Sequence, residues 1–388
     1  MDFDKIIDRR GTHSAKWDKM EDYYGVSPDD GIAMWVADMD FHAPDTVRNA
    51  VRDYADSVYG YFGDDSDYRA AICWWMKERH GWPVDPAHIF STHGLGNGIG
   101  LCLDAFTDPG DGVVLFTPVY HAFATRIRAS NRQVVECEMP LVDGRYELDF
   151  EAWDAQMSGK ETMLIFCSPH NPGGRVWTRE ELEQVADFAR RHDLILLSDE
   201  IHHDLVFPGS KHIPMTAIDG ITDRLVMATA PSKTFNTAGL HTGQVTIADE
   251  TLRARFGARI AALGITPNSV GLVACTAAYS PEGARWVDAL VNYLDGNREL
   301  FDAGVNAIPG VQSIRLEATY LAWVDFAGTG MDMAEVKRRV QQVARVAPNH
   351  GETFGKGGET FLRFNLGTQR TRVEEAVHRL REAFSDLQ

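Results

Sequence analysis

MLIFCSPHNPGGRVWTREELEQVADFARRHDLILLSDE, residues 163–200, is the stretch that decides the fold. It contains two short apolar runs, MLIFC and LILL, and each has the length and composition of a buried strand. Between them, residues 178–192 repeat apolar side chains at helical spacing, and Thr178 and Glu181 can form a capping box at the helix start. A buried strand, a helix and a second buried strand predict a parallel sheet that helices cover on both faces.

The same kind of apolar strand recurs on both sides of this stretch, as GVVLFTP at 112–118 and RLVMATA at 224–230. Residues near 252–305 have a largely helical pattern, so we expect them to join this region to the rest of the chain. The predicted fold class is therefore α/β, with a large domain built on a mostly parallel sheet that is covered by helices.

The end of the chain has a different pattern, in which strands and helices alternate without long buried runs. We expect two strands and two helices there, at 320–326, 359–367, 333–346 and 372–384. Mixed strands with helices on one side predict a smaller α+β domain. We therefore expect a large domain at 46–280 and a small domain made of 1–45 and 281–388.

Composition excludes several classes of function. The chain has 388 residues and a net charge of −18, which would repel the phosphates of nucleic acid or of an anionic membrane. No apolar run approaches the length of about 18 residues that a membrane span needs. The five cysteines are scattered and odd in number, which suits a reducing compartment better than a disulfide framework or a zinc site. We expect a cytoplasmic protein with no nucleic-acid or membrane partner.

Three polar residues follow three of the predicted strands. Asn171 comes after 163–167, Asp199 after 194–197, and Lys233 after 224–230. Ligands of an open parallel sheet bind beyond the carboxyl ends of its strands. If these strands are neighbours, an amide, a carboxylate and an amine converge in one crevice.

Such a trio suits pyridoxal 5′-phosphate. A lysine amine at an apolar sheet edge, such as Lys233, can be kept partly neutral by desolvation and can form a Schiff base with an aldehyde. A buried carboxylate such as Asp199 would keep the ring nitrogen protonated, so that the ring accepts electrons. The amide of Asn171 would donate to the phenolic oxygen. The cofactor we predict is therefore pyridoxal 5′-phosphate, and the partner is a small amino-acid substrate.

The phosphate group needs backbone N–H groups, and the glycine-rich STHGLGNGIGLCLDAF at 91–106 leads into an apolar helix that can provide them. The segment is no dinucleotide fingerprint, because Ile99 stands where a third glycine is required. Ser232 could add a hydroxyl to the phosphate site. Tyr120, just past the strand that ends in FTP, could stack its ring on the cofactor.

These residues belong to motifs that resemble a known family. The chain is similar to the fold-type I pyridoxal-phosphate enzymes of the class I/II aminotransferase group, and most similar to the MalY/PatB subgroup of carbon–sulfur β-lyases. The resemblance covers nearly the whole length. It rests on ordered motifs: RRGTHSAKWD, MWVADMDF, YGYFG, TPVYHAF, SPHNPGGRVW, SDEIHHDLVF, APSKTFNTAGL and FLRFNLG.

The resemblance implies a role for each matching position around the ring. Lys233 would be the Schiff-base lysine, and Asp199 would pair with the pyridine nitrogen. Asn171 would bond the phenolic oxygen, with His202 beside it. Tyr120 would stack on the ring.

It also implies contacts at the two ends of the ligand. Leu95 and Gly96, with Ser232, would contact the phosphate, and Arg363 would clamp the substrate α-carboxylate with its planar fork. In similar proteins the residue at Tyr61 reaches the cofactor of the neighbouring subunit. The resemblance thus implies a homodimer whose active sites are shared between subunits.

Two positions depart from the pattern of the family. Three residues before Lys233, many relatives have a hydroxyl residue, and this chain has Ala230. Eight residues after it, where aminotransferases usually have a phosphate-binding arginine, this chain has His241. The departures leave the phosphate contacts open.

Plainer interpretations exist for most of these residues. Asp199 could cap a helix, Asn171 could set a turn, Arg363 could be a strand-surface arginine, and Tyr61 and Tyr120 could be packing residues. His202, His203 and Asp204 suggest a metal site, but without a third spaced ligand we predict no metal. These alternatives are outcomes that the structure can test.

Three functions remain open at this point. The first is β-elimination from cystathionine or a cysteine S-conjugate, which gives pyruvate, ammonia and a thiol. The second is transamination between an amino acid and a 2-oxo acid, which uses the same residues. The third is a binding or regulatory role without catalysis, although Lys233, Asp199 and Arg363 are all present. The subgroup motifs favour the lyase.

Overall fold

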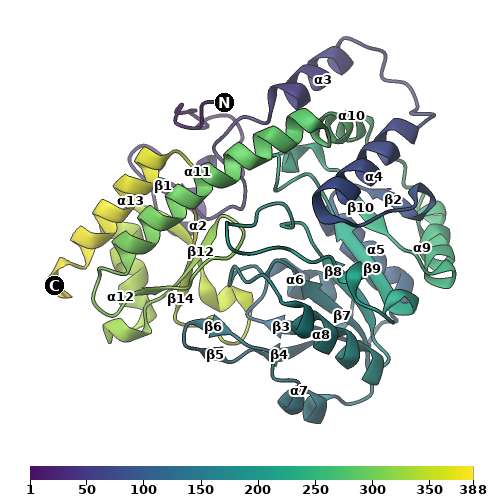
Figure 1. Ribbon diagram of the computed structural model, residues 1–388. Helices are drawn as coiled ribbons and strands as arrows, with labels where there is room; N and C mark the ends of the chain where they lie inside the picture. The colour runs from purple at the N-terminus through teal and green to yellow at the C-terminus, as the bar shows by residue number, and fades with distance from the viewer. Residues whose placement is uncertain (388) are drawn as a thin grey trace.

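The computed structural model describes residues 1–387 and is organised around a seven-stranded and a five-stranded sheet (Figure 1). The larger sheet has the spatial order β2, β10, β9, β8, β7, β3 and β4. In that order the strands span Ile89–Thr92, Gly243–Thr246, Leu225–Thr229, Ile195–Asp199, Glu161–Cys167, Gly112–Thr117 and Gln133–Glu138. Only the pairs that β10 makes with β2 and β9 are antiparallel. The predicted α/β fold with a mostly parallel sheet is confirmed.

Helices cover both faces of this sheet, because alternate residues of its strands point to opposite sides. In β3, Val113 and Leu115 pack with α5, α6 and α9, whereas Val114 and Phe116 pack with α7 and α8. These five helices span Leu95–Phe106, Ala122–Ala129, Glu250–Ala262, Phe150–Gln156 and Arg179–Arg191. The predicted capping box at the start of α8 is present, since Thr178 Oγ1 accepts from the Glu181 N–H at 3.2 Å.

The smaller sheet joins the two ends of the chain. Its order is β1, β13, β14, β12 and β11, at Ile32–Met34, Val346–His350, Phe361–Asn365, Leu321–Asp325 and Gln312–Ser313. The strand β1 pairs in parallel with β13, so the N-terminal segment lies in the same sheet as the C-terminal strands. This arrangement supports the domain division that we propose, 46–280 for the large domain and 1–45 with 281–388 for the small one.

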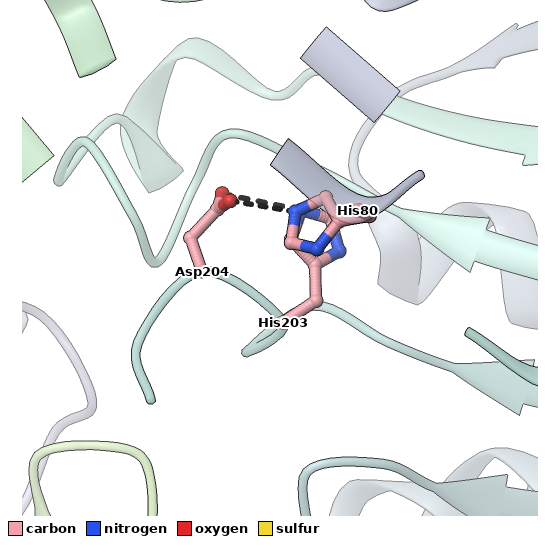
Figure 2. A group of neighbouring side chains, drawn as sticks. All are labelled: His80, His203 and Asp204. Atoms are coloured by element: carbon pink, nitrogen blue, oxygen red, sulfur yellow. Dashed lines mark hydrogen bonds and ion pairs between the residues drawn. The ribbon is translucent and has the colours of Figure 1, made fainter. Parts of the chain in front are cut away.

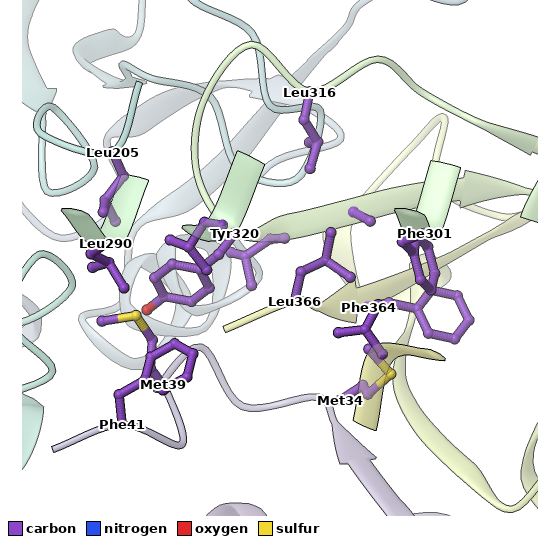
Figure 3. Packing of buried hydrophobic residues seen from close by; sticks show 14 of the residues in the cluster. Met34, Met39, Phe41, Leu205, Leu290, Phe301, Leu316, Tyr320, Phe364 and Leu366 are labelled. Carbon is purple, nitrogen blue, oxygen red and sulfur yellow. The ribbon is translucent and has the colours of Figure 1, made fainter. Parts of the chain in front are cut away.

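A large apolar core connects the smaller sheet to the helices that pass between the two parts (Figure 3). Met39 and Phe41 of the N-terminal segment, Leu290 and Phe301 of α11, and Phe364 of β14 all belong to it. The remaining α-helices are α1, α2, α3, α4, α10, α11, α12 and α13, which span Ala15–Asp18, Met20–Tyr24, Asp45–Ala55, Ser66–His80, Ser269–Ala278, Pro281–Val305, Met333–Arg338 and Arg370–Ala383. The predicted helical joint at 252–305 is therefore formed by α9, α10 and α11.

One predicted helix is wrong at its C-terminal end. The pattern at 333–346 indicates a continuous helix, but α12 ends at Arg338 and a π-helical turn follows at Arg339–Val343. Arg345 then adopts a left-handed conformation with φ of 56°, and β13 starts at Val346. The partner strands β1 and β14 bind the backbone of this segment, which overrides its local helical pattern.

A buried ion cluster fixes the N-terminal segment. Asp40 accepts hydrogen bonds from Lys16 Nζ, Trp17 Nε1 and Arg9 Nη1, each at 2.9 Å. Burial alone would raise the pKa of Asp40, but these donors outweigh it and lower that pKa to about 2. The motifs RRGTHSAKWD and MWVADMDF are thus held together, and the cluster anchors residues 34–41 next to the large sheet.

The longest helix, α11, has 25 residues, which is enough to span a bilayer in length. It is amphipathic, however, with Asp288 exposed and Leu290 buried in the core. Among residues 1–387, no helix is both long and apolar enough to cross a membrane.

Candidate active site

The structure brings together the three polar residues that follow the predicted strands. The strands β7, β8 and β9 are adjacent and parallel, so their carboxyl ends meet at one edge of the sheet. Asn171, Asp199 and Lys233 line a single cavity of about 390 Å³ beyond that edge. This volume lies within the usual range for small-molecule sites, about 300–1,000 Å³.

Lys233 follows the end of β9 and is largely enclosed. Its Nζ donates a hydrogen bond to the carbonyl of Ala37, in the 34–41 segment, at 2.7 Å. Burial lowers the pKa of the amine to about 8, and Arg363 acts in the same direction against the attraction of Asp38 and Asp199. The amine is therefore much closer to its neutral, nucleophilic form at neutral pH than a surface lysine would be.

This shift predicts the pH dependence of aldehyde capture. Only the neutral amine attacks an aldehyde, so the rate at which Lys233 captures pyridoxal should rise with pH through about 8 rather than 10.5. Trapping with borohydride across a pH series, in protein stripped of any aldehyde, measures this rate. Nα-Acetyl-lysine in the same buffers is the reference. An identical pH profile for the protein and the reference would contradict the effect of burial.

Asp199 ends β8 and is buried. Its Oδ1 accepts a hydrogen bond from the Ile201 N–H at 3.1 Å, and within residues 1–387 it makes no salt bridge. Burial raises the pKa of this carboxyl to about 7, although the Ile201 N–H and Lys233 lower it. A cationic N–H placed in the cavity would satisfy the carboxylate, which is the partner that a protonated pyridine ring offers.

Arg363 of β14 is buried and is held by neutral groups. Its Nη1 donates to Asn171 Oδ1 at 2.9 Å and its Nη2 to the Trp35 carbonyl at 2.9 Å, and the guanidinium lies 4.9 Å from the centre of the Phe354 ring. Burial lowers its pKa to about 10, so it remains charged at neutral pH. In the described part of the chain no carboxylate pairs with it, so an incoming carboxylate can.

The bond to Arg363 also orients Asn171. Because Asn171 Oδ1 accepts from the guanidinium, the NH₂ group of the amide is the part that can donate to a ligand in the cavity. The buried His202 lines the same cavity, and its Nδ1 has no hydrogen-bond partner among residues 1–387. Burial, Lys233 and Arg363 hold the pKa of His202 well below its ordinary value, so the ring is neutral.

The remaining predicted contacts also lie at the cavity, with one exception. Tyr120, Leu95, Gly96 and Ser232 line it, at the start of α5 and beside β3 and β9. Tyr61 does not, because it lies on the loop between α3 and α4 and is fully exposed to solvent. The structure therefore brings together nine of the ten sequence-predicted site residues, counting Arg363 through its bond to Asn171.

Comparison with known proteins agrees with this geometry. The profile of the family described as aminotransferase class I and II matches residues 36–380. The chain belongs to the class I and II aminotransferase family. Within this family, the cystathionine beta-lyase PatB of Bacillus subtilis (strain 168) is 37% identical over 99% of this chain and 100% of its own.

Two further proteins resemble the chain over nearly its whole length. Protein MalY of Escherichia coli (strain K12) is 31% identical over 97% of both chains. The crystal structure of cystalysin from Treponema denticola, which contains a pyridoxal 5′-phosphate cofactor, has a TM-score of 0.94 and 35% identity, and covers 100% of this chain and 99% of its own. The similarity to the MalY/PatB subgroup is confirmed.

The site of this class I and II aminotransferase family member fits pyridoxal phosphate by the chemistry of its donors. The aldehyde needs a partly neutral amine, which Lys233 provides. The ring nitrogen needs a buried carboxylate that has no other cation, and the phenolic oxygen needs a free amide donor; Asp199 and Asn171 provide these. Arg126 of α6 also lines the cavity. The sequence did not single it out, because its place depends on how α6 packs against α5.

A second buried cluster lies directly behind the site, where His80 of α4 meets His203 and Asp204 (Figure 2). The sequence did not predict His80 as a neighbour, since nothing in α4 distinguishes it. Asp204 accepts hydrogen bonds from His80 Nε2 at 2.8 Å, Trp75 Nε1 at 3.0 Å and Thr234 Oγ1 at 2.8 Å. We interpret the cluster as a hydrogen-bonded network that fixes Thr234, the residue after Lys233.

The pKa values of the two histidines of this network are shifted in opposite directions. Burial and the neighbouring His203 lower the pKa of His80 to about 4. Burial also disfavours charge on His203, but Asp204 outweighs it and raises the pKa of His203 above its ordinary value. Together they hold the pKa of Asp204 well below its usual range. The network thus contains one buried carboxylate, Asp204, whose charged form is stabilised by the groups that donate hydrogen bonds to it.

Removing that carboxylate should destabilise the fold. We expect Asp204→Ala to lower the free energy of unfolding by about 3–5 kcal/mol, because it leaves several buried donors without an acceptor. Denaturant unfolding measures the change. The control is Asp288→Ala, which breaks the exposed ion pair with Arg79 and should cost less than about 1 kcal/mol. Equal effects of the two substitutions on the free energy of unfolding would show that the network does not stabilise the fold.

Proposed function

We propose that the protein is a pyridoxal-phosphate-dependent carbon–sulfur β-lyase that acts on cystathionine or cysteine S-conjugates. The observation that carries the proposal is the single cavity where Lys233, Asp199 and Asn171 meet, with Arg363 bonded to Asn171. Relatives of full length add support, since PatB, at 37% identity, is named as a cystathionine beta-lyase.

The residues divide the work of the reaction. When bound, the cofactor supplies an aldehyde for attachment and an aromatic ring that takes up negative charge from the substrate. Lys233 would hold the aldehyde covalently and, once the amino acid has taken its place, would remove the Cα proton as general base. Asp199 would keep a proton on the ring nitrogen, and Asn171 would donate to the phenolic oxygen. Loss of a thiol from Cβ, followed by hydrolysis with one water molecule, would give pyruvate and ammonia.

Arg363 would orient the substrate by its α-carboxylate. We expect Arg363→Lys to raise KM for cystathionine by about 10- to 100-fold, because lysine keeps the charge but loses the two-pronged hydrogen bonding. Steady-state kinetics measure this effect. Cofactor content, followed by absorbance, should stay unchanged and acts as the control. A fall in cofactor content without a rise in KM would assign Arg363 to the cofactor.

The competing function is transamination, which the family description suggests and which uses the same residues. Both reactions begin with removal of the Cα proton, and they separate only when a group leaves from Cβ. Purified protein should be incubated with cystathionine and no added 2-oxo acid, and pyruvate should be followed with time. Stoichiometric excess of pyruvate over enzyme supports the lyase. Turnover that requires a 2-oxo acid would overturn the proposal in favour of the aminotransferase.

We also infer a cytoplasmic homodimer with shared active sites. Val58, Tyr59, Tyr61 and Phe62 form an exposed apolar stretch on the loop between α3 and α4, and burial against a second copy would cover it. Five free cysteines are consistent with a reducing compartment. Sedimentation analysis of the purified chain tests the dimer. Tyr61→Ala should weaken cofactor binding only if the loop reaches the other subunit.

A further inference from the structure

We propose that Arg126 is the fixed positive charge that binds the phosphate of the cofactor. The inference rests on the proposed function, since it assumes that pyridoxal phosphate occupies the cavity. It assigns a role to a residue outside the motifs of the sequence, and it answers the question that His241 and Ala230 leave open.

In this chain the cation that binds the phosphate must come from a position other than 241, where aminotransferases usually have it. His241 occupies the position where aminotransferases usually have the arginine, and Ala230 replaces a hydroxyl residue. The N-terminus of α5 and the Ser232 hydroxyl offer hydrogen bonds at this end of the cavity. Of the residues that line the cavity, Arg126 is the one whose side chain is always charged, and a guanidinium can pair with a phosphate bidentately.

Arg126 is held in position to supply that charge. It extends from α6 to the first turn of α5, where its Nε donates to the Gly96 carbonyl at 3.0 Å and its Nη1 donates to the Ala122 carbonyl at 3.0 Å. The side chain lines the cavity together with Leu95 and Ser232. Across residues 1–387 it forms no salt bridge with any carboxylate. A preorganised guanidinium that lacks an anion is suited to bind one.

Glycine at position 96 is what allows this approach. A Cβ atom placed on Gly96 would lie 2.3 Å from Arg126 Nη2 and 3.0 Å from its Cζ, so any larger residue would displace the guanidinium. The backbone φ of Gly96 is not in the left-handed region, in contrast to Gly94, whose φ is 80°. The requirement for glycine at 96 therefore comes from the close approach of Arg126 and not from backbone conformation.

The test compares two aldehydes that differ only in the phosphate. Protein freed of cofactor is titrated with pyridoxal phosphate and with pyridoxal, and binding is followed by quenching of tryptophan fluorescence. We expect Arg126→Met to weaken binding of pyridoxal phosphate by about 10- to 100-fold and to leave binding of pyridoxal unchanged. The matched control is Arg128→Met, an exposed arginine of the same helix, which should change neither.

A second variant tests the position of the Arg126 guanidinium without removing the arginine. Gly96→Ala retains the arginine but displaces its guanidinium, so it should reproduce the selective loss. Equal weakening of both aldehydes by Arg126→Met would reduce Arg126 to a structural role, and no weakening of either would also overturn the inference. If the unaltered protein binds no pyridoxal phosphate at all, the proposed function fails instead, and the two failures are thereby distinguished.

Discussion

Replacing Lys233 with alanine is expected to lower turnover of cystathionine by about 10³-fold or more. The same amine attaches the cofactor and removes the Cα proton, and a positioned general base alone contributes about 10²- to 10⁴-fold. The structure makes the effect specific to this lysine, because burial lowers its pKa to about 8 and its amine lies in the cavity. Pyruvate release measures the loss.

The control for this experiment is Lys211→Ala, which removes an exposed lysine and should leave turnover unchanged. Treatment with borohydride provides a second readout, since it should fix the cofactor to the unaltered chain and not to Lys233→Ala. Full activity in Lys233→Ala would refute the mechanism. Covalent attachment in that variant would show that another amine holds the cofactor.

The substitution Asp199→Asn should be almost as damaging. Asparagine has nearly the same shape but no charge, so it cannot hold a proton on the ring nitrogen. Losing one partner of a buried ion pair costs about 3–5 kcal/mol, which corresponds to a fall in turnover of about 10²- to 10⁴-fold. Cofactor should still attach to Lys233, because the lysine and the phosphate site are unchanged.

A cofactor analogue tests the reason for this loss. A ring methylated on its nitrogen carries a permanent positive charge, so it should restore part of the activity of Asp199→Asn but not raise that of the unaltered protein. The matched control is Asp193→Asn, an exposed residue in the turn before β8, which should behave like the unaltered protein. If the methylated ring gives no recovery, Asp199 does not act through the charge of the ring nitrogen.

The sequence was sufficient for four strands of the large sheet, β3, β7, β8 and β9. These strands are continuous apolar runs, and buried parallel strands leave that pattern because both of their faces are covered. It was not sufficient for β13, which starts at Val346, the last residue of the segment 333–346 whose pattern predicts a helix. That strand exists because β1, from more than 300 residues earlier, supplies a parallel partner, and no local pattern contains this information.

The residues of the site likewise fall into those that the sequence predicts and those that it does not. Asn171, Asp199 and Lys233 were predictable because each lies at or shortly after the end of a strand, and strand ends of a parallel sheet meet. Arg126 and His80 were not, since each reaches its place from a helix through packing contacts. Tyr61 remains a prediction, because its expected role requires a second copy of the chain.

The bond between Lys233 and the carbonyl of Ala37 has a consequence for anyone who recombines this enzyme with its relatives. The reactive amine comes from the middle of the chain, while the carbonyl facing it comes from the first forty residues or so, which Asp40 ties down separately. A chimera with one crossover between them would combine halves that have not evolved together. Exchange should therefore move the N-terminal segment together with the middle of the chain that carries Lys233.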